Sequence, residues 1–469
     1  MKLLKKLNLF DFTMIVVSLV IGMGIFRTPV NVAKAVDTPF IFFGVWIVGG
    51  LIALCGALTY AEIGSRLPVT GGYYKVFSYA YHPSIAFAIN CIILVSNAAS
   101  LAAVALVGGE YITGVLMPET KDALWLKNAA NALHIQTIQI IIALSAIVIF
   151  YGVNLLGLKM SARTQNVLMI VKICMILLLI TPLFFATQSA PLVTVTNDSG
   201  GSMFTEYLKA FGIGLVAVSF TYGGYQQTIN FGAEVDQPQK NIPRGIFMGI
   251  FIIISLYLII NYAYVKVIGF EELKTCKNIA AIMASKIFGV NAERVLSIFL
   301  FLSVLAYVNV LLMSNPRVMA AMSEDQILPA IFRKRNARTE VLTTSLSVFA
   351  AVCAIIVFWA KDFDRILSFT IFLDCFGMAL SAATIFILRK KTKHLDNTGI
   401  YKMKLYPLLP IIFITAYTFV AISIAADYKN NDYAALTGLS VLAAFIGIYF
   451  AVHFFQVRKK NKDAEETAL

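Results

Sequence analysis

Long apolar runs, separated by short polar segments, cover almost the whole chain of 469 residues. A helix needs about 20 apolar residues to cross the hydrocarbon core of a bilayer. The chain contains twelve such runs, at residues 11–35, 40–66, 84–116, 136–157, 164–185, 206–231, 243–268, 294–323, 341–359, 363–388, 405–427 and 433–456. This pattern predicts an all-α integral membrane protein with twelve transmembrane helices, embedded in the lipid bilayer.

Composition supports this prediction. The chain is 59% hydrophobic and only 13% charged, with a mean hydropathy of +0.80, which lies far outside the range of soluble proteins. The net charge of +13 does not indicate nucleic acid binding, because the basic residues lie beside the spans. Basic groups precede the first span and follow the eighth, tenth and twelfth. The positive-inside rule then predicts that both termini lie in the cytoplasm. We expect the protein in the plasma (inner) membrane.

Two glycines, Gly22 and Gly24, interrupt the first apolar run near its middle. A membrane helix normally pairs all its backbone groups, since an unsatisfied N–H or C=O costs several kcal/mol in hydrocarbon. An unwound segment offers free amides and carbonyls to a polar ligand, and the half-helix after the break points its positive dipole end at anions. The break therefore predicts a ligand site at this depth.

A second break, at Gly223-Gly224, interrupts the sixth run at a corresponding depth. If the first five spans (residues 1–185) and the next five (206–390) are two copies, each begins with a broken helix. An odd number of spans inverts the second copy in the membrane, as in many secondary transporters. We expect the two remaining spans (404–456) to be an appendage, followed by a cytoplasmic tail (457–469).

Several polar side chains lie inside the spans. Lys172 lies nine residues from Arg163, hence about 13 Å deep, where an ionisable residue is a functional candidate. A purely structural partner for Lys172 is the alternative. Asn97 either bonds to a neighbouring helix or lines a pocket. For Glu62 and Arg66, at the end of the second span, we expect a solvated i, i+4 ion pair.

Taken together, these motifs resemble the amino acid-polyamine-organocation transporter superfamily, and within it the L-type amino acid exchangers. The similarity runs from Asp11 to about Lys391. It rests on the first glycine motif, the end of span two, the stretch around span five, the second break with Asn230 and Glu234, and residues 261–264 in span seven. The resemblance implies a LeuT-type 5+5 inverted repeat with broken helices one and six.

The resemblance also implies a substrate site. The amides of Met23 and Gly24 would bind the α-carboxylate, and Ile25 continues the same motif. Carbonyls of Val20, Phe220 and Gly223 would hold the α-ammonium, with the Phe220 ring covering the pocket from outside. Relatives commonly have Ser where this chain has Met23, so that one side-chain hydroxyl is absent here.

In sodium-coupled proteins of this fold, a cation lies between the first broken helix and span eight. The middle of span eight, residues 303–309, has no adjacent hydroxyl pair, and we expect the Lys172 ammonium to replace the sodium ion. Human-type relatives pair with a heavy chain through a cysteine between spans three and four. Residues 116–135 contain no cysteine, so we expect no disulfide-linked heavy chain.

Arg27 and Asp374 are predicted to form an outer gate together with Phe220. By helical rise, Arg27 lies about 24 Å from the inner surface and Asp374 about 13 Å below the outer one. An acid at that depth needs a partner, and Arg27 is the nearest suitable cation by depth. The alternative is that Arg27 extends to the membrane surface while Asp374 is protonated or bonded to Asn97.

The sequence thus predicts a secondary transporter that exchanges neutral L-amino acids by alternating access, independently of sodium. Proton-coupled symport of an amino acid or amine (polyamine) is the alternative. A channel would need a continuous polar ring or hydrophobic gate, and an enzyme would need a nucleophile or metal cluster. Neither pattern is present in the sequence, nor is an ATP-binding glycine-rich loop, so we expect no cofactor, no metal and no enzymatic activity.

Overall fold

The computed structural model describes residues 6–116, 134–185, 203–276, 279–280, 282–283, 290–359, 363–396, 399–426 and 433–467. These residues form helices and contain no named strand, only isolated bridges between Leu7 and Val235 and between Thr70 and Phe231. The first half comprises α1 (Leu9–Val20), α2 (Gly24–Ala35), α3 (Pro39–Arg66), α4 (Gly72–Ala80), α5 (Pro83–Leu116), α7 (His134–Leu155), α8 (Leu158–Ile180) and α9 (Pro182–Phe185).

The second half begins with α10 (Met203–Tyr222), η2 (Tyr225–Asn230), η3 (Gly232–Glu234), α11 (Pro238–Val267) and α12 (Phe270–Thr275). It continues with α14 (Val290–Glu324), η4 (Ala330–Arg333), α15 (Thr343–Trp359), α16 (Phe363–Lys391), η5 (Lys393–Leu395), α17 (Leu408–Ala426) and α18 (Ala434–Thr467). The predicted all-α class is therefore confirmed.

Ten segments of the described chain are long and apolar enough to cross a membrane, and Thr343–Phe358 is a shorter apolar helix. The sixth predicted span corresponds to α10 and the ninth to α15, so each of the twelve predicted runs contains a helix. The pairing of these helices into inverted repeats stays a prediction.

The first break lies where the glycines predict it. A capping box between Asn8 and Asp11 starts α1, which ends at Val20. Residues 21–23 are not helical, and α2 begins at Gly24 with no side-chain cap on its first amides. One apolar run thus becomes two half-helices with unpaired backbone groups between them.

The second break faces the first. Helix α10 ends at Tyr222, and the chain turns through Gly224 at φ +111° into the 3₁₀ helix η2. A Cβ atom on Gly224 would lie 2.1 Å from the carbonyl oxygen of Leu19, so only glycine allows this approach. The two interrupted helices therefore meet backbone to backbone.

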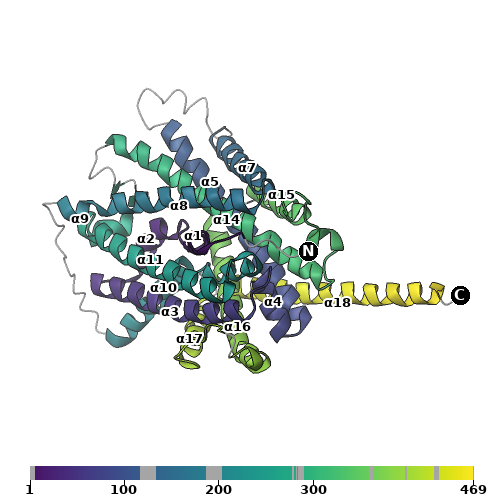
Figure 1. The fold of residues 1–469 in the computed structure, drawn as a ribbon. Coiled ribbons are helices and arrows are strands. Elements are labelled where there is room, and N and C mark those ends of the chain that lie inside the picture. The colour runs from purple at the N-terminus through teal and green to yellow at the C-terminus, as the bar shows by residue number, and fades with distance from the viewer. Residues whose placement is uncertain are drawn as a thin grey trace.

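The half-helices α1 and α2 lie in the interior of the bundle, between α8, α10 and α11 (Figure 1). Helix α1 packs against α8, α11, α14 and η2, whereas α2 packs against α3, α10 and α12. By contrast, α18 extends well beyond the other helices and carries the C-terminus (Figure 1). This arrangement encloses both breaks in protein, the setting in which irregular backbone is tolerated at membrane depth.

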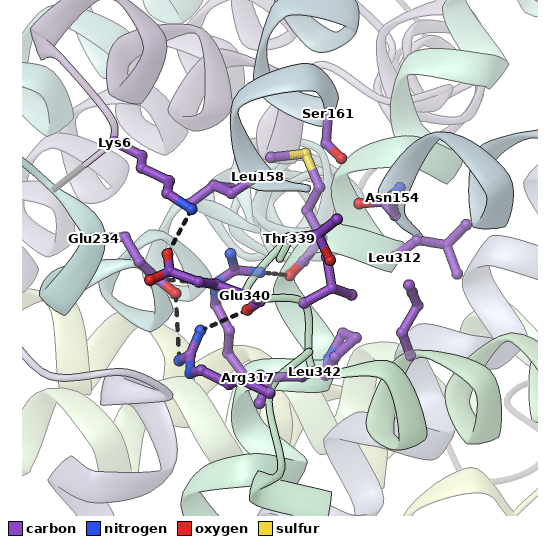
Figure 2. A pocket seen from close by; sticks show the side chains of 15 residues that line it. Lys6, Asn154, Leu158, Ser161, Glu234, Leu312, Arg317, Thr339, Glu340 and Leu342 are labelled. Atoms are coloured by element: carbon purple, nitrogen blue, oxygen red, sulfur yellow. Dashed lines mark hydrogen bonds and ion pairs between the residues drawn. The ribbon is translucent and has the colours of Figure 1, made fainter. Parts of the chain in front are cut away.

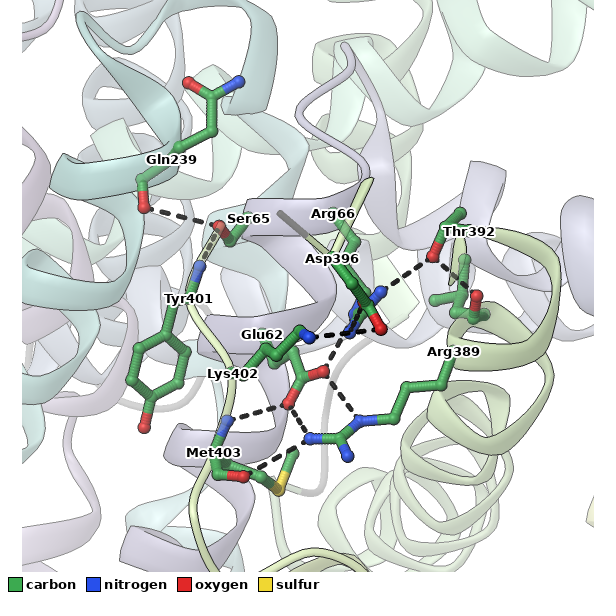
Figure 3. Close-up of polar contacts among 11 residues, drawn as sticks. Glu62, Ser65, Arg66, Gln239, Arg389, Thr392, Asp396, Tyr401, Lys402 and Met403 are labelled. Carbon is green, nitrogen blue, oxygen red and sulfur yellow. Dashed lines mark hydrogen bonds and ion pairs between the residues drawn. The ribbon is translucent and has the colours of Figure 1, made fainter. Parts of the chain in front are cut away.

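The interpretation of Glu62 and Arg66 as a solvated pair is wrong. Both side chains are buried, and the Glu62 carboxylate accepts hydrogen bonds from Arg66 Nε at 2.8 Å, from Arg389 Nη2 at 2.6 Å and from the Met403 amide at 2.9 Å (Figure 3). Arg66 also reaches Asp396 at 3.0 Å. The network joins α3 to α16 and to the segment before α17. Those elements cover the C-terminal end of α3, which the sequence alone predicts to be exposed.

Candidate functional site

A cavity of about 110 Å³ lies between the two helix breaks. Its wall combines backbone of both breaks with side chains of α5, α14, α16 and α17. The lining residues are Leu19, Val20, Gly22, Met23, Gly24, Arg27, Thr28, Asn31, Ser96, Asn97, Ser100, Val104, Ser219, Phe220, Thr221, Gly223, Gly224, Gln226, Gln227, Tyr307, Leu311, Asp374, Cys375, Met378 and Tyr417. Every predicted binding or gate residue except Ile25 is among them, whereas Lys172, predicted to replace a sodium ion, is not.

The amides of Met23 and Gly24 are candidate anion donors. Neither amide has a hydrogen-bond acceptor within the described part of the chain, and α2 starts at Gly24. Free amides at a helix N-terminus, together with the helix dipole, favour a carboxylate. Ile25, in contrast, is fully buried and does not line the cavity, so its side chain contributes to the core.

Two of the three carbonyl groups predicted to hold an ammonium, those of Val20 and Phe220, already accept hydrogen bonds. The Val20 carbonyl accepts from the Gly22 amide at 2.7 Å and from the Tyr257 hydroxyl at 3.2 Å. The Phe220 carbonyl accepts from the Gly223 amide at 3.1 Å. A carbonyl oxygen has two lone pairs, so Phe220 retains acceptor capacity. Both positions on Val20 are occupied when the Tyr257 hydroxyl donates to it and not to the Thr221 carbonyl.

Lys172 contacts the first break directly. Its side chain is 1% exposed, and Nζ donates to the Ile21 carbonyl at 2.6 Å. Ile21 is the first non-helical residue after α1, so its carbonyl has lost its helical partner. The ammonium of α8 thus satisfies an acceptor that the break exposes.

Asn97 both bonds to neighbours and lines the cavity. Its Nδ2 donates to Gln227 Oε1 at 3.2 Å and to Asn315 Oδ1 at 2.7 Å, and its Oδ1 accepts from Gln227 Nε2 at 3.0 Å. Asn97 does not bond to Asp374 in this conformation, so the alternative in which Asp374 bonds to Asn97 does not apply to it. The contacts join α5 to η2 and α14.

Arg27 and Asp374 line the same cavity without forming a pair here. Arg27 Nη2 lies 3.4 Å from Glu110 Oε2, and both side chains are partly exposed. Within the described residues, Asp374 makes no ion pair. In this conformation the Arg27 charge is paired away from Asp374, and the gate remains a prediction.

Charged side chains line a second, smaller cavity, of about 40 Å³, beside the segment before α1 (Figure 2). Glu234, 2% exposed, accepts from Arg317 at 3.1 Å and lies 3.7 Å from Arg335, while Lys6 pairs with Glu340 at 2.5 Å. The Lys6 amide donates to the Glu234 carbonyl at 2.9 Å. These contacts hold the segment before α1 and the end of η3 against α14 and the segment before α15.

The sequence alone does not predict two features of the site. Gln227 and Asn315 complete the amide cluster around Asn97, and Tyr257 reaches the carbonyls of Val20 and, at 3.4 Å, of Thr221. The polar run directly after Gly223-Gly224 is the only sequence signal for Gln227. No local pattern marks Tyr257, because its role depends on α11 packing against both breaks.

The apolar helices and the cavity between two interrupted helices indicate a membrane transport protein. Among the described residues no cluster of three or more His, Cys, Asp or Glu could hold a metal ion. A family model described as amino acid permease matches residues 7–451, so the chain belongs to the amino acid permease family. Its members are transporters and not enzymes, as predicted.

Curated relatives agree with this assignment. The chain is 26% identical to the serine/threonine exchanger SteT of Bacillus subtilis (strain 168), over 95% of this chain and 97% of that protein. It is 26% identical to the human cystine/glutamate transporter, over 95% and 86% of the two chains. It is 24% identical to the human large neutral amino acids transporter small subunit 2, over 97% and 82%.

Proposed function

We propose that this protein exchanges neutral L-amino acids across the membrane by alternating access, independently of sodium. The observation that carries the proposal is the cavity between two facing helix breaks, with free amides at Met23 and Gly24 for a carboxylate. Of the relatives described above, one is named as an exchanger and another as a transporter of large neutral amino acids.

Lys172 supports sodium independence. An ammonium on the Ile21 carbonyl would supply the positive charge that a bound sodium ion would otherwise bring to the first break. The ammonium is part of the chain, so no cation gradient is needed to fill this position. Proton-coupled symport is the competing mechanism, and only flux measurements separate it from exchange.

The arrangement in the membrane is part of the proposal. Two inverted five-helix repeats with two further helices, α17 and α18, lie in the plasma membrane with both termini in the cytoplasm. The end that carries the Glu234 ion pairs would then be the cytoplasmic end, and the end of the cavity that carries Arg27 would face the outside. We also propose that the chain works without a disulfide-linked heavy chain; residues 116–135, which lack cysteine, lie largely outside the described part.

Counterflow in proteoliposomes tests the function. Purified protein is reconstituted with an unlabelled amino acid inside and labelled amino acid outside, in sodium or choline buffer and with or without a pH gradient. We expect saturable, stereospecific uptake that needs internal substrate and is equal in both buffers. Uptake driven by the pH gradient into empty vesicles would support the symporter instead, and an ohmic current without substrate dependence would refute transport by alternating access.

A further inference from the structure

The cavity contains a pair of neutral amides that bond to each other in both directions. Asn97 on α5 donates to Gln227 Oε1 at 3.2 Å, and Gln227 on η2 donates back to Asn97 Oδ1 at 3.0 Å. Both side chains are at least nine-tenths buried, at 5% and 7% exposure, and both line the cavity. A third amide, Asn315 on α14, holds Asn97 from behind through a 2.7 Å bond.

A count of donors and acceptors shows what this pair has left to offer. The two N–H groups of Asn97 are used, one by Gln227 and one by Asn315. Gln227 has two N–H groups and uses one, on Asn97. Each carboxamide oxygen accepts one bond and has a second lone pair. The pair therefore presents one free N–H and two acceptor positions, without any net charge.

We propose that the Asn97–Gln227 pair determines specificity by binding a hydroxyl or carboxamide in the side chain of the substrate. This inference rests on the proposed function and narrows its substrates to polar neutral L-amino acids. Hydroxyls and carboxamides both donate and accept, as the pair requires. The lining also includes Ser96 and the Ser100–Tyr307 hydroxyl pair, joined at 2.9 Å, so polar groups continue around this part of the cavity.

The site should disfavour a substrate with an apolar side chain. Such a side chain would cover the free Gln227 N–H and exclude water without supplying an acceptor, and an unsatisfied buried donor is costly. Sites built to hydrogen-bond a substrate hydroxyl discriminate strongly against analogues that lack it, whereas apolar pockets reject an added hydroxyl poorly.

The first test uses the wild-type protein and isosteric pairs of substrates. L-threonine is compared with L-valine, and L-glutamine with L-methionine, by thermal stabilisation of the purified protein and by counterflow. We expect the polar member to bind at least about tenfold more tightly in each pair. Equal affinities, or tighter binding of the apolar member or of L-lysine, overturn the inference while exchange of those substrates leaves the proposed function standing. If no L-amino acid is exchanged, the proposed function itself fails.

The second test replaces the two amides with apolar side chains of similar shape. The Asn97→Leu, Gln227→Met double variant removes both partners of the mutual bonds, and only Asn315 Oδ1 loses its donor. Its threonine-to-valine affinity ratio is expected to fall at least tenfold, toward one. Asn90→Leu is the control, because Asn90 is a buried amide of the same helix that donates only to the Ala86 carbonyl and does not line the cavity. An unchanged ratio in the double variant refutes the assignment.

Discussion

The Nζ atom of Lys172 lies 2.6 Å from the carbonyl oxygen of Ile21, and this one contact joins α8 to the break between α1 and α2. The contact makes the unwound segment and a buried cation interdependent. Each would be costly alone, since a carbonyl without a partner and an ammonium without an acceptor are both disfavoured away from water.

Lys172→Met should abolish or strongly reduce exchange. The variant leaves the Ile21 carbonyl without its donor, at a cost of about 1–3 kcal/mol, and the break should rearrange. Counterflow and substrate-induced thermal stabilisation measure the loss. Lys159→Met, at an exposed position of the same helix, is the control and should behave as wild type. Normal exchange by Lys172→Met at every pH and without sodium would show that Lys172 does not replace a cation.

Gly24→Val should eliminate substrate binding while the protein still inserts. A Cβ atom at Gly24 would lie only 3.0 Å from Thr221 Oγ1 and Cγ2, so a branched side chain separates the two breaks and covers the free amides. Binding is measured by scintillation proximity with a labelled substrate. Gly152→Val is the matched control, because no atom beyond its chain neighbours and its own helix backbone lies within 4 Å of a Cβ built there. Retained affinity in Gly24→Val would contradict a carboxylate site on these amides.

If Arg27 and Asp374 form the outer gate, their contributions to transport should be energetically coupled. Arg27→Asp and Asp374→Arg should each slow exchange, and the double swap should recover part of it. The resting contact of Arg27 with Glu110 is a competitor, so Glu110→Gln should shift the equilibrium toward the Asp374 pairing and not abolish transport. A double-mutant cycle with coupling below about 0.5 kcal/mol would show that Arg27 and Asp374 do not interact.

Glu62→Gln should lower the melting temperature of the protein in detergent. The substitution leaves the guanidinium groups of Arg66 and Arg389 facing a neutral amide in a buried network, and breaking a buried ion pair typically costs about 3–5 kcal/mol. Glu271→Gln is the control, because its ion pair with Lys274 is half exposed. Equal melting temperatures of Glu62→Gln and wild type would mean that the network adds no stability.

Asp396 should make the stability of the same network depend on pH. Its hydrogen bond from Lys402, supported by Arg66, holds the pKa of this carboxyl below its usual value near 3.9. A depressed folded-state pKa stabilises the protein above the unfolded value, and the effect is lost as the pH falls through the folded one. The melting temperature should therefore drop below about pH 4 more steeply for wild type than for Asp396→Asn. Substitution of the exposed Asp37 by Asn should leave the slope unchanged.

The sequence by itself determined the helices and both breaks, and it predicts the depth of Lys172. These properties are local: apolar length sets a span, Gly22 and Gly223-Gly224 weaken it at one point, and helical rise sets depth. The family resemblance then placed the amides of Met23 and Gly24 in the site. Met23 and Gly24 do line the cavity.

Only the tertiary structure decided which polar groups meet. Asn97 and Gln227 are 130 residues apart and Glu62 and Arg389 are 327 apart, so no spacing along the chain relates them. The burial of Glu62 depends on α16 and on the segment before α17, which cover a helix end that looks exposed in sequence. Arg27 contacts Glu110 and not Asp374. Spacing along a helix predicts only how deep a residue lies, whereas the packing of the helices decides the direction in which its side chain points.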